Sequence, residues 1–240
     1  MSQLPYRPRS RNRLWLSAAV CLCGAMAAST AHAADPLGKQ GQFAIGAERL
    51  FGYVHSSVSY DDNLETTETN DRFSLLSNSV RGFGNVYNTP RLTVDYFVID
   101  RLSVGLGLGF ATVSGSTEAG AGGTRVERDT GSRSAFLFSA RAGYAFMFTD
   151  IIGFWPRAGL TYVTNGFTDP DDNTARESDW ALSFEGQLVV TPLPHVMLLI
   201  GPTVDVGIAG SRSAEFANTE TSVDRSSTEI GVQAGAGVFF

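Results

Sequence analysis

The sequence predicts an all-β fold, an eight-stranded antiparallel up-and-down transmembrane β-barrel. Eight segments alternate between bulky apolar residues and small or polar residues, which is the pattern of strands with two chemically different faces. The connections between these segments are alternately long and short, as in barrels that cross a membrane as strands. The sequence also stops inside an apolar alternation, on Phe240, which predicts a last strand that pairs with the first.

The N-terminal 33 residues predict a secretory signal peptide, so that the barrel domain occupies residues 34–240. Four arginines between positions 7 and 13 precede a mostly apolar stretch, residues 14–29, that is too short for a membrane span. Ala31-His32-Ala33 has the small-residue pattern of a cleavage site. Both cysteines, Cys21 and Cys23, lie in this leader, so we expect a mature chain without disulfides or thiol chemistry.

The charge of the mature chain argues against a nucleic-acid partner. Without the four arginines of the leader, 14 basic residues remain against 24 acidic ones, a net charge of −10. After the leader, no apolar run approaches the roughly 18 residues that a helical membrane span requires. A chain of this composition would therefore cross a membrane only as strands.

The alternating segments define the expected strands. In order along the chain they are residues 42–60, 90–99, 101–114, 132–148, 153–164, 179–191, 196–209 and 227–240. In the last of them, the even-numbered residues from Ile230 to Phe240 are apolar, and the odd-numbered residues between them are mostly glycine or polar. In the first segment, the alternation is interrupted at Arg49, which occupies a position expected to be apolar. A bulge near Glu48 to Leu50 would restore the register.

The glycines indicate which face of the strands points into the barrel, because they lie on the face that carries small and polar residues. The competing fold is a soluble lipocalin-like barrel, whose apolar face lines a cavity and whose polar face meets water. A water-facing surface rich in glycine would weaken every strand, whereas the narrow interior of an eight-stranded barrel accepts small residues. The large apolar residues then face lipid. The glycines concerned are Gly105, Gly107, Gly109, Gly143, Gly231, Gly235 and Gly237.

The connections predict the orientation of the barrel. The long ones span 61–89, 115–131, 165–178 and 210–226, and the short ones lie around Asp100, at 149–152 and at 192–195. With an even number of strands, both termini fall on the short-turn side, the periplasmic rim. Aromatic residues near strand ends are expected to form interfacial girdles. These are Tyr144, Phe146, Phe148, Trp155 and Tyr162.

The C-terminal residues Gln233, Gly235, Val238 and Phe240 match the assembly signal of outer-membrane barrels. Together with the strand count and loop alternation, they make residues 34–240 resemble the small barrels of the OmpA and OmpX type, without a periplasmic domain. This resemblance implies a monomer in the outer membrane of a Gram-negative-type cell. It also implies contact with outer-membrane lipid, lipopolysaccharide and the barrel assembly machinery, and no cofactor or metal.

Charged residues on the inward face predict a polar network in the lumen. Charges inside a narrow barrel are costly unless they are paired, so a hydrogen-bonded plug is expected. The alternative is a narrow channel or porin-like passage for ions or small solutes. The residues are Asp95, Arg141, Arg157, Glu185, Asp205 and Glu229.

Two short motifs suggest chemistry, but we expect neither to be a catalytic or metal site. His55 and Ser57 have the His-x-Ser spacing of the lipid A deacylases, another family of eight-stranded outer-membrane barrels, yet the sequence offers no acidic partner for the histidine. The loop Asp169 to Asn173 begins like a calcium loop but lacks its glycine and its bidentate glutamate, so a solvated acidic loop is favoured over weak divalent-ion binding.

The sequence therefore predicts a non-enzymatic barrel with a structural or surface-interaction role. The long loops are rich in Ser, Thr, Asn, Asp and Glu, and loops on a rigid frame are the usual binding surface. The first of them also contains apolar residues, which predict that residues 65–85 fold over the barrel mouth as a lid. These residues are Phe73, Leu75, Leu76, Val80 and Phe83. A passage for solutes is the second hypothesis and a lipid A-modifying enzyme the third.

Overall fold

The computed structural model describes residues 36–61, 66–75, 87, 89–119, 126–169, 173–216 and 219–240. The chain divides into two units, Met1–Ala34 and Asp35–Phe240, and all described residues belong to the second. The predicted signal peptide, with Cys21 and Cys23, lies outside the described residues. Within the described part, no helix is long and apolar enough to span a membrane.

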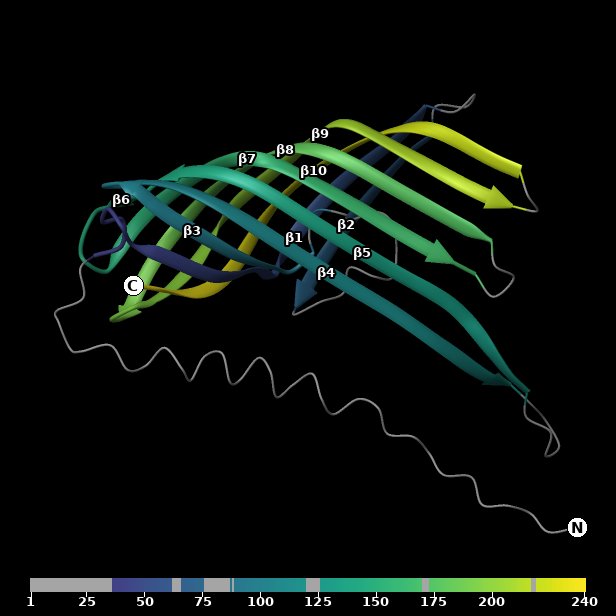
Figure 1. Cartoon of the computed structure of the whole chain (residues 1–240), viewed down its shortest axis with the longest axis horizontal. Coiled ribbons are helices and arrows are strands. Elements are labelled where there is room, and N and C mark those ends of the chain that lie inside the picture. Colours follow the sequence, from purple (N-terminus) through teal and green to yellow (C-terminus); the bar gives the residue numbers. More distant parts are fainter. Residues whose placement is uncertain are drawn as a thin grey trace, which may run out of the picture. The chain divides into compact units, whose positions relative to one another are not determined.

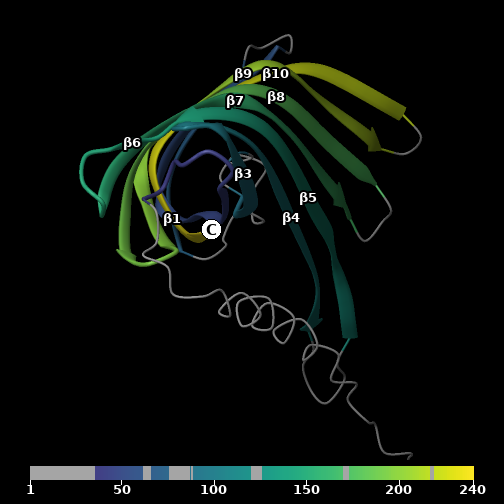
Figure 2. The same cartoon turned by 60° about the vertical axis from the view of Figure 1, so that its left-hand side comes forward.

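The described chain is a closed antiparallel barrel with eight strands in its ring. Hydrogen bonding follows the order β10, β9, β8, β7, β5, β4, β3, β1, and β1 pairs with β10 to close it. Figure 2 shows the ring nearly end-on, with the C-terminus beside β1. The elements are β1 (Phe43–Asp61), β2 (Thr66–Leu75), β3 (Arg91–Ile99), β4 (Leu102–Ala119), β5 (Val126–Tyr144), β6 (Phe146–Met147), β7 (Ile152–Thr168), β8 (Thr174–Leu193), β9 (Val196–Phe216) and β10 (Thr219–Phe239). Each of the eight predicted segments contributes one ring strand, so the predicted fold is confirmed.

The first and last strands, β1 and β10, pair with each other and close the barrel. The backbones of Phe43 and Phe240 exchange two hydrogen bonds, of 2.9 and 3.0 Å, and their rings stack with centroids 6.2 Å apart. The register then continues through Ile45 opposite Val238 and Gly46 opposite Gly237. The terminal aromatic residue thus completes the ladder between the first and last strands.

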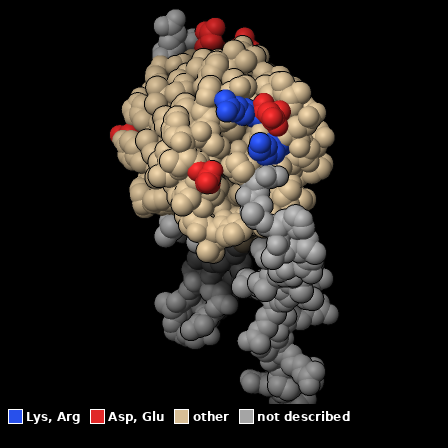
Figure 3. Space-filling model, turned by 90° about the vertical axis from the view of Figure 1, so that its left-hand side faces the viewer, with Lys and Arg blue, Asp and Glu red and all other residues tan. Residues whose placement is uncertain are grey.

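The outside of the ring is apolar and the inside holds the small and polar residues. On β4, Leu106, Leu108 and Phe110 are between 53% and 70% exposed, whereas Ser103 is fully buried. The inward direction of the glycines is confirmed, because a methyl group added to Gly105 would meet the carboxylate of Asp95 and one added to Gly107 the hydroxyl of Ser139. Figure 3 faces the end with the C-terminus, where only a few charged residues interrupt an uncharged surface.

Aromatic pairs mark both borders of the apolar surface. The rings of Tyr162 and Trp180 pack with centroids 4.8 Å apart, near the end of the barrel from which the long strands extend. The rings of Tyr144 and Phe146 lie 4.7 Å apart near the opposite end, where short turns connect the strands. Trp155 departs from the expected girdle. It is fully buried in the lumen, because its neighbours Phe154 and Pro156 on β7 occupy the outward positions.

The expected bulge in β1 is present and changes the strand's partner. Arg49 has a positive φ of 56°, and the register against β10 shifts between Ala47 and Phe51. Before the bulge in the sequence, β1 pairs with β3. After it, from Phe51 to Tyr60, β1 pairs with β2. Because the bulge inserts two residues, the consecutive side chains of Glu48 and Arg49 both point into the lumen.

The segments predicted to be long loops are largely strand, so this prediction is wrong. β4 and β5 remain paired as far as Ala119 and Val126, and β8 and β9 as far as Thr174 and Glu215. In Figures 1 and 2 these strands extend away from the ring as a curved sheet. Runs of serine, threonine and charged residues hide this pairing in the sequence, because the backbone ladder does not require an apolar face.

The predicted lid is also wrong where the structure describes it. Residues 66–75 form β2 along the outer half of β1, and Phe73 packs edge-on against Phe51 on the outward face, with centroids 5.8 Å apart. Leu76, Val80 and Phe83 lie outside the described residues. Tyr87 from the same connection is instead fully buried inside the barrel.

Candidate functional site: the charged layer and the outer surface

A layer of charged side chains crosses the lumen. We call it the charged layer; seven strands of the ring contribute to it, and all of its members are buried. Its members are Glu48, Arg49, Arg91, Asp95, Arg141, Arg157, Glu185, Asp205 and Glu229. All six residues predicted from the sequence therefore point inward and meet in one place.

Arg141 binds acids from three different strands, among them Glu185 on β8 at 3.5 Å. It donates to Asp95 on β3 at 2.5 Å and to Glu48 on β1 at 2.7 and 2.8 Å. Arg157 also donates to Glu48, at 2.7 Å. Since guanidinium and carboxylate groups form their strongest hydrogen bonds with each other, Glu48 ties β5 and β7 to β1.

Glu185 is the second centre of the charged layer. It forms ion pairs with Arg157 at 2.8 Å and Arg49 at 3.2 Å, and a further one with Arg91. Arg49 additionally donates to Asp205 at 2.6 Å. Four arginines and four acids, from β1, β3, β5, β7, β8 and β9, are thus connected through shared partners.

Sequence reasoning missed three members of this layer. Glu48 and Arg49 escape a simple alternation because the bulge turns two consecutive residues inward. Arg91 lies four residues before Asp95 on the same face of β3, so extending the alternation to the start of that strand would have found it. Without them, the predicted set had two arginines for four acids, a set that could not be neutral.

Glu229 stands apart from the paired charges. It lies directly opposite Asp205 on the neighbouring strand, and no arginine within ion-pair distance is found among the described residues. Its carboxylate accepts a hydrogen bond from the Tyr87 backbone, while Oε2 has no partner in the described part of the chain. Arg49 donates to the Tyr87 carbonyl at 2.6 Å, and Ser227 donates to the Tyr87 hydroxyl at 3.0 Å, so Tyr87 caps the layer.

Small spaces adjoin the charged layer in the described part of the chain. Two of them have volumes of about 10 Å³ each, one beside Ser139 and one beside Gln233. A space of this size holds about one water molecule. Between the charged layer and the short-turn end of the barrel lies an apolar cluster, in which the rings of Phe97 and Trp155 stack with centroids 5.5 Å apart.

The residues of the predicted assembly signal occupy different sides of the last strand. Gln233 points into the lumen and is buried, and Gly235 lies beside Ala47 and Glu48 at the bulge. Val238 pairs with Ile45, and Phe240 closes the seam with Phe43.

On the outward face, the structure supplies the acidic partner that the sequence did not reveal for His55. Asp71 on β2 lies directly opposite His55, and the distance from Nδ1 to the carboxylate Oδ1 is 2.8 Å. The Tyr53 hydroxyl donates to the same oxygen at 2.6 Å. These hydrogen bonds, from Tyr53 and from His55, lower the pKa of the Asp71 carboxyl below its ordinary value.

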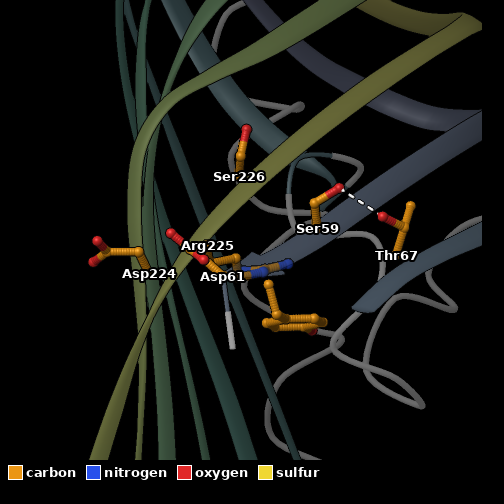
Figure 4. A pocket seen from close by; sticks show the side chains of 7 residues that line it. Ser59, Asp61, Thr67, Asp224, Arg225 and Ser226 are labelled. Atoms are coloured by element: carbon orange, nitrogen blue, oxygen red, sulfur yellow. Dashed lines mark hydrogen bonds between the residues drawn. The ribbon is translucent and has the colours of Figure 1, made fainter. Parts of the chain in front are cut away.

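A polar pocket lies at the outer ends of β1, β2 and β10. Its volume is about 470 Å³, and its lining includes Asp61, Asp224 and Arg225 (Figure 4). Asp61 and Asp224 are directly opposite each other in the ladder and exposed to solvent. A hydrogen bond of 3.1 Å joins Ser59 to Thr67 at the edge of this pocket.

The acidic loop after β7 is closed by its own residues. Asp169 accepts a hydrogen bond from the Asn173 backbone at 2.8 Å and another from its side chain at 2.8 Å. Asp171 lies outside the described residues. Among the residues that the structure describes, no group of three or more histidines, cysteines or acids is placed to hold a metal ion.

Comparison with known proteins supports the fold. No family model matches the chain, and no curated protein matches its sequence. The outer membrane protein OprG from Pseudomonas aeruginosa is similar in structure, with 16% identity, a TM-score of 0.52, and coverage of 85% of this chain and 97% of OprG. The outer membrane protein AlkL gives 13% identity, a TM-score of 0.53, and coverage of 88% of this chain and 96% of AlkL. The protein thus has the fold of the small eight-stranded outer-membrane β-barrels.

Proposed function

We propose that the protein is a sealed barrel that acts through its surface beyond the membrane. The charged layer carries this proposal, because a lumen crossed by paired charges leaves the exterior as the working surface. Breaking buried ion pairs to admit a solute would leave uncompensated charges, at a cost of about 3–5 kcal/mol for each lost partner. The role requires no catalysis in the lumen.

The outer strands support a surface role. Their ladders continue past Tyr162 and Trp180 as a hydrogen-bonded sheet, so the polar residues there are held on a rigid frame. On this frame, Asp61 and Asp224 form a pair of exposed carboxylates beside the polar pocket. Hard divalent cations prefer oxygen ligands and can bridge carboxylates to phosphate groups. We therefore infer that this part of the surface binds the phosphate groups of lipopolysaccharide through calcium or magnesium.

Binding of purified lipopolysaccharide to the refolded protein tests this role. We expect saturable binding in the presence of Ca²⁺ that is lost on chelation, and at least a tenfold weaker affinity in the Asp61→Asn/Asp224→Asn variant. Asp100→Asn, at the opposite end of the barrel, is the matched control and should bind as the unaltered protein does. Binding that is unaffected by chelation and by the double substitution would contradict the proposed surface.

A further inference from the structure

The cluster around His55 is the part of the molecule that the proposed function leaves unused. Tyr53, His55 and Ser57 are alternate residues of β1 and share its outward face. The side chains of His55 and Asp71 are 48% and 60% exposed, so molecules outside the barrel can reach them. Alternate residues of a strand are about 7 Å apart, which lets the imidazole of His55 reach towards the hydroxyl of Ser57.

The contact with Asp71 sets the protonation of the imidazole. A carboxylate only accepts hydrogen bonds, so the nitrogen that contacts it, Nδ1, carries the proton. Nε2 is then the basic nitrogen, able to take a proton from a hydroxyl. Tyr53 donates to the same carboxylate oxygen and so fixes the position of Asp71.

The cluster lies where the apolar surface of the barrel ends. Ile230 is opposite His55 and Val232 opposite Tyr53, and both are at least 50% exposed on the outward face. One step further out, Thr228 is opposite Ser57, and Ser226 follows opposite Ser59. An acyl chain lying on the apolar side would place its ester group at this border.

We propose that Ser57, His55 and Asp71 form an ester-hydrolysing site for acyl-chain esters at the outer membrane surface. Ser57 Oγ attacks the ester carbonyl carbon, and its proton passes to His55 Nε2. The C–O bond of the ester breaks, and His55 returns the proton to the departing alcohol oxygen. Water then attacks the acyl carbon and gives a proton to His55 Nε2. The bond from that carbon to Ser57 Oγ breaks, His55 returns the proton to Oγ, and the carboxylic acid leaves. Asp71 stabilises the imidazolium in both steps.

Hydrolysis of p-nitrophenyl laurate by the folded protein tests the site, with folding checked by heat-dependent gel mobility. We expect turnover that falls at least 100-fold in Ser57→Ala and in His55→Ala, in line with the loss of a nucleophile or its general base. Asp71→Asn should lower kcat at least tenfold with little change in KM. Ser134→Ala, an exposed outward serine on β5, is the matched control and should keep full activity.

A covalent probe separates this site from the lipopolysaccharide surface. A fluorophosphonate should label the unaltered protein on Ser57, without calcium or lipopolysaccharide, and should not label Ser57→Ala. Folded protein that neither cleaves the ester nor takes up the probe would overturn the proposal, as would unchanged turnover in Ser57→Ala. Either result leaves the lipopolysaccharide assay unaffected, because that assay depends on Asp61 and Asp224.

Discussion

Arg49 is the residue on which the charged layer most depends. Its positive φ places the guanidinium in the lumen, where it contacts Asp205, Glu185 and the Tyr87 carbonyl. A left-handed backbone is unfavourable for a residue other than glycine, so the contacts of this side chain offset a local cost. Strand register, bulge and ion pairing are therefore linked at one position.

Replacing Arg49 tests whether its charge or its volume matters. We expect Arg49→Met to lower the free energy of unfolding by about 3–5 kcal/mol, because Asp205 would be left buried without its cation. Adding Asp205→Leu should recover much of the loss, since replacing both members of a buried pair by apolar groups is often neutral. Urea unfolding in lipid vesicles measures both. Equal losses in the single and double variants would show that the unpaired charge is not the cause.

At the level of elements, the ring strands could be predicted from the sequence and the outer sheet could not. Strands such as β4 and β10 carry an uninterrupted alternation because one face meets lipid and the other a narrow lumen. Beyond the membrane both faces meet water, so the outer parts of β5, β8 and β9 need no alternation. β2 could not be predicted from the sequence for the same reason.

The candidate sites divide in the same way. The inward charges follow from alternation alone, whereas the pairing of His55 with Asp71 depends on the register between β1 and β2. That register joins residues 16 positions apart through a hairpin that the sequence presents as a loop. Once β2 is recognised, the acidic partner follows from counting residues across the hairpin.

The closing pair of strands offers a test at this scale. Deleting Phe240 removes two backbone hydrogen bonds to Phe43 and the stacking of their rings. We expect the shortened chain to insert into vesicles more slowly and less completely than the full chain, as judged by heat-dependent gel mobility. Phe148→Ala, which removes an exposed aromatic residue away from the seam, is the control. Normal insertion without Phe240 would contradict the role assigned to the terminal residue.

For the molecule as a whole, two consecutive layers of buried side chains occupy the described part of the lumen. The charged layer occupies the middle, and the apolar cluster with Phe97 and Trp155 lies towards the short-turn end of the barrel. The outside combines an apolar surface for lipid with a polar sheet beyond it. Under the proposed function, the ring and its lumen supply stability and the outer surface supplies recognition.

The sealed lumen is tested most directly by the conductance of the refolded, unaltered protein in a planar lipid bilayer. Its insertion is confirmed independently by heat-dependent gel mobility of the same sample. With the charged layer and the apolar cluster in place, we expect a silent bilayer at moderate voltages while folded protein is present. Discrete, reproducible conductance steps from the unaltered protein would contradict the sealed barrel and favour a passage for ions or small solutes.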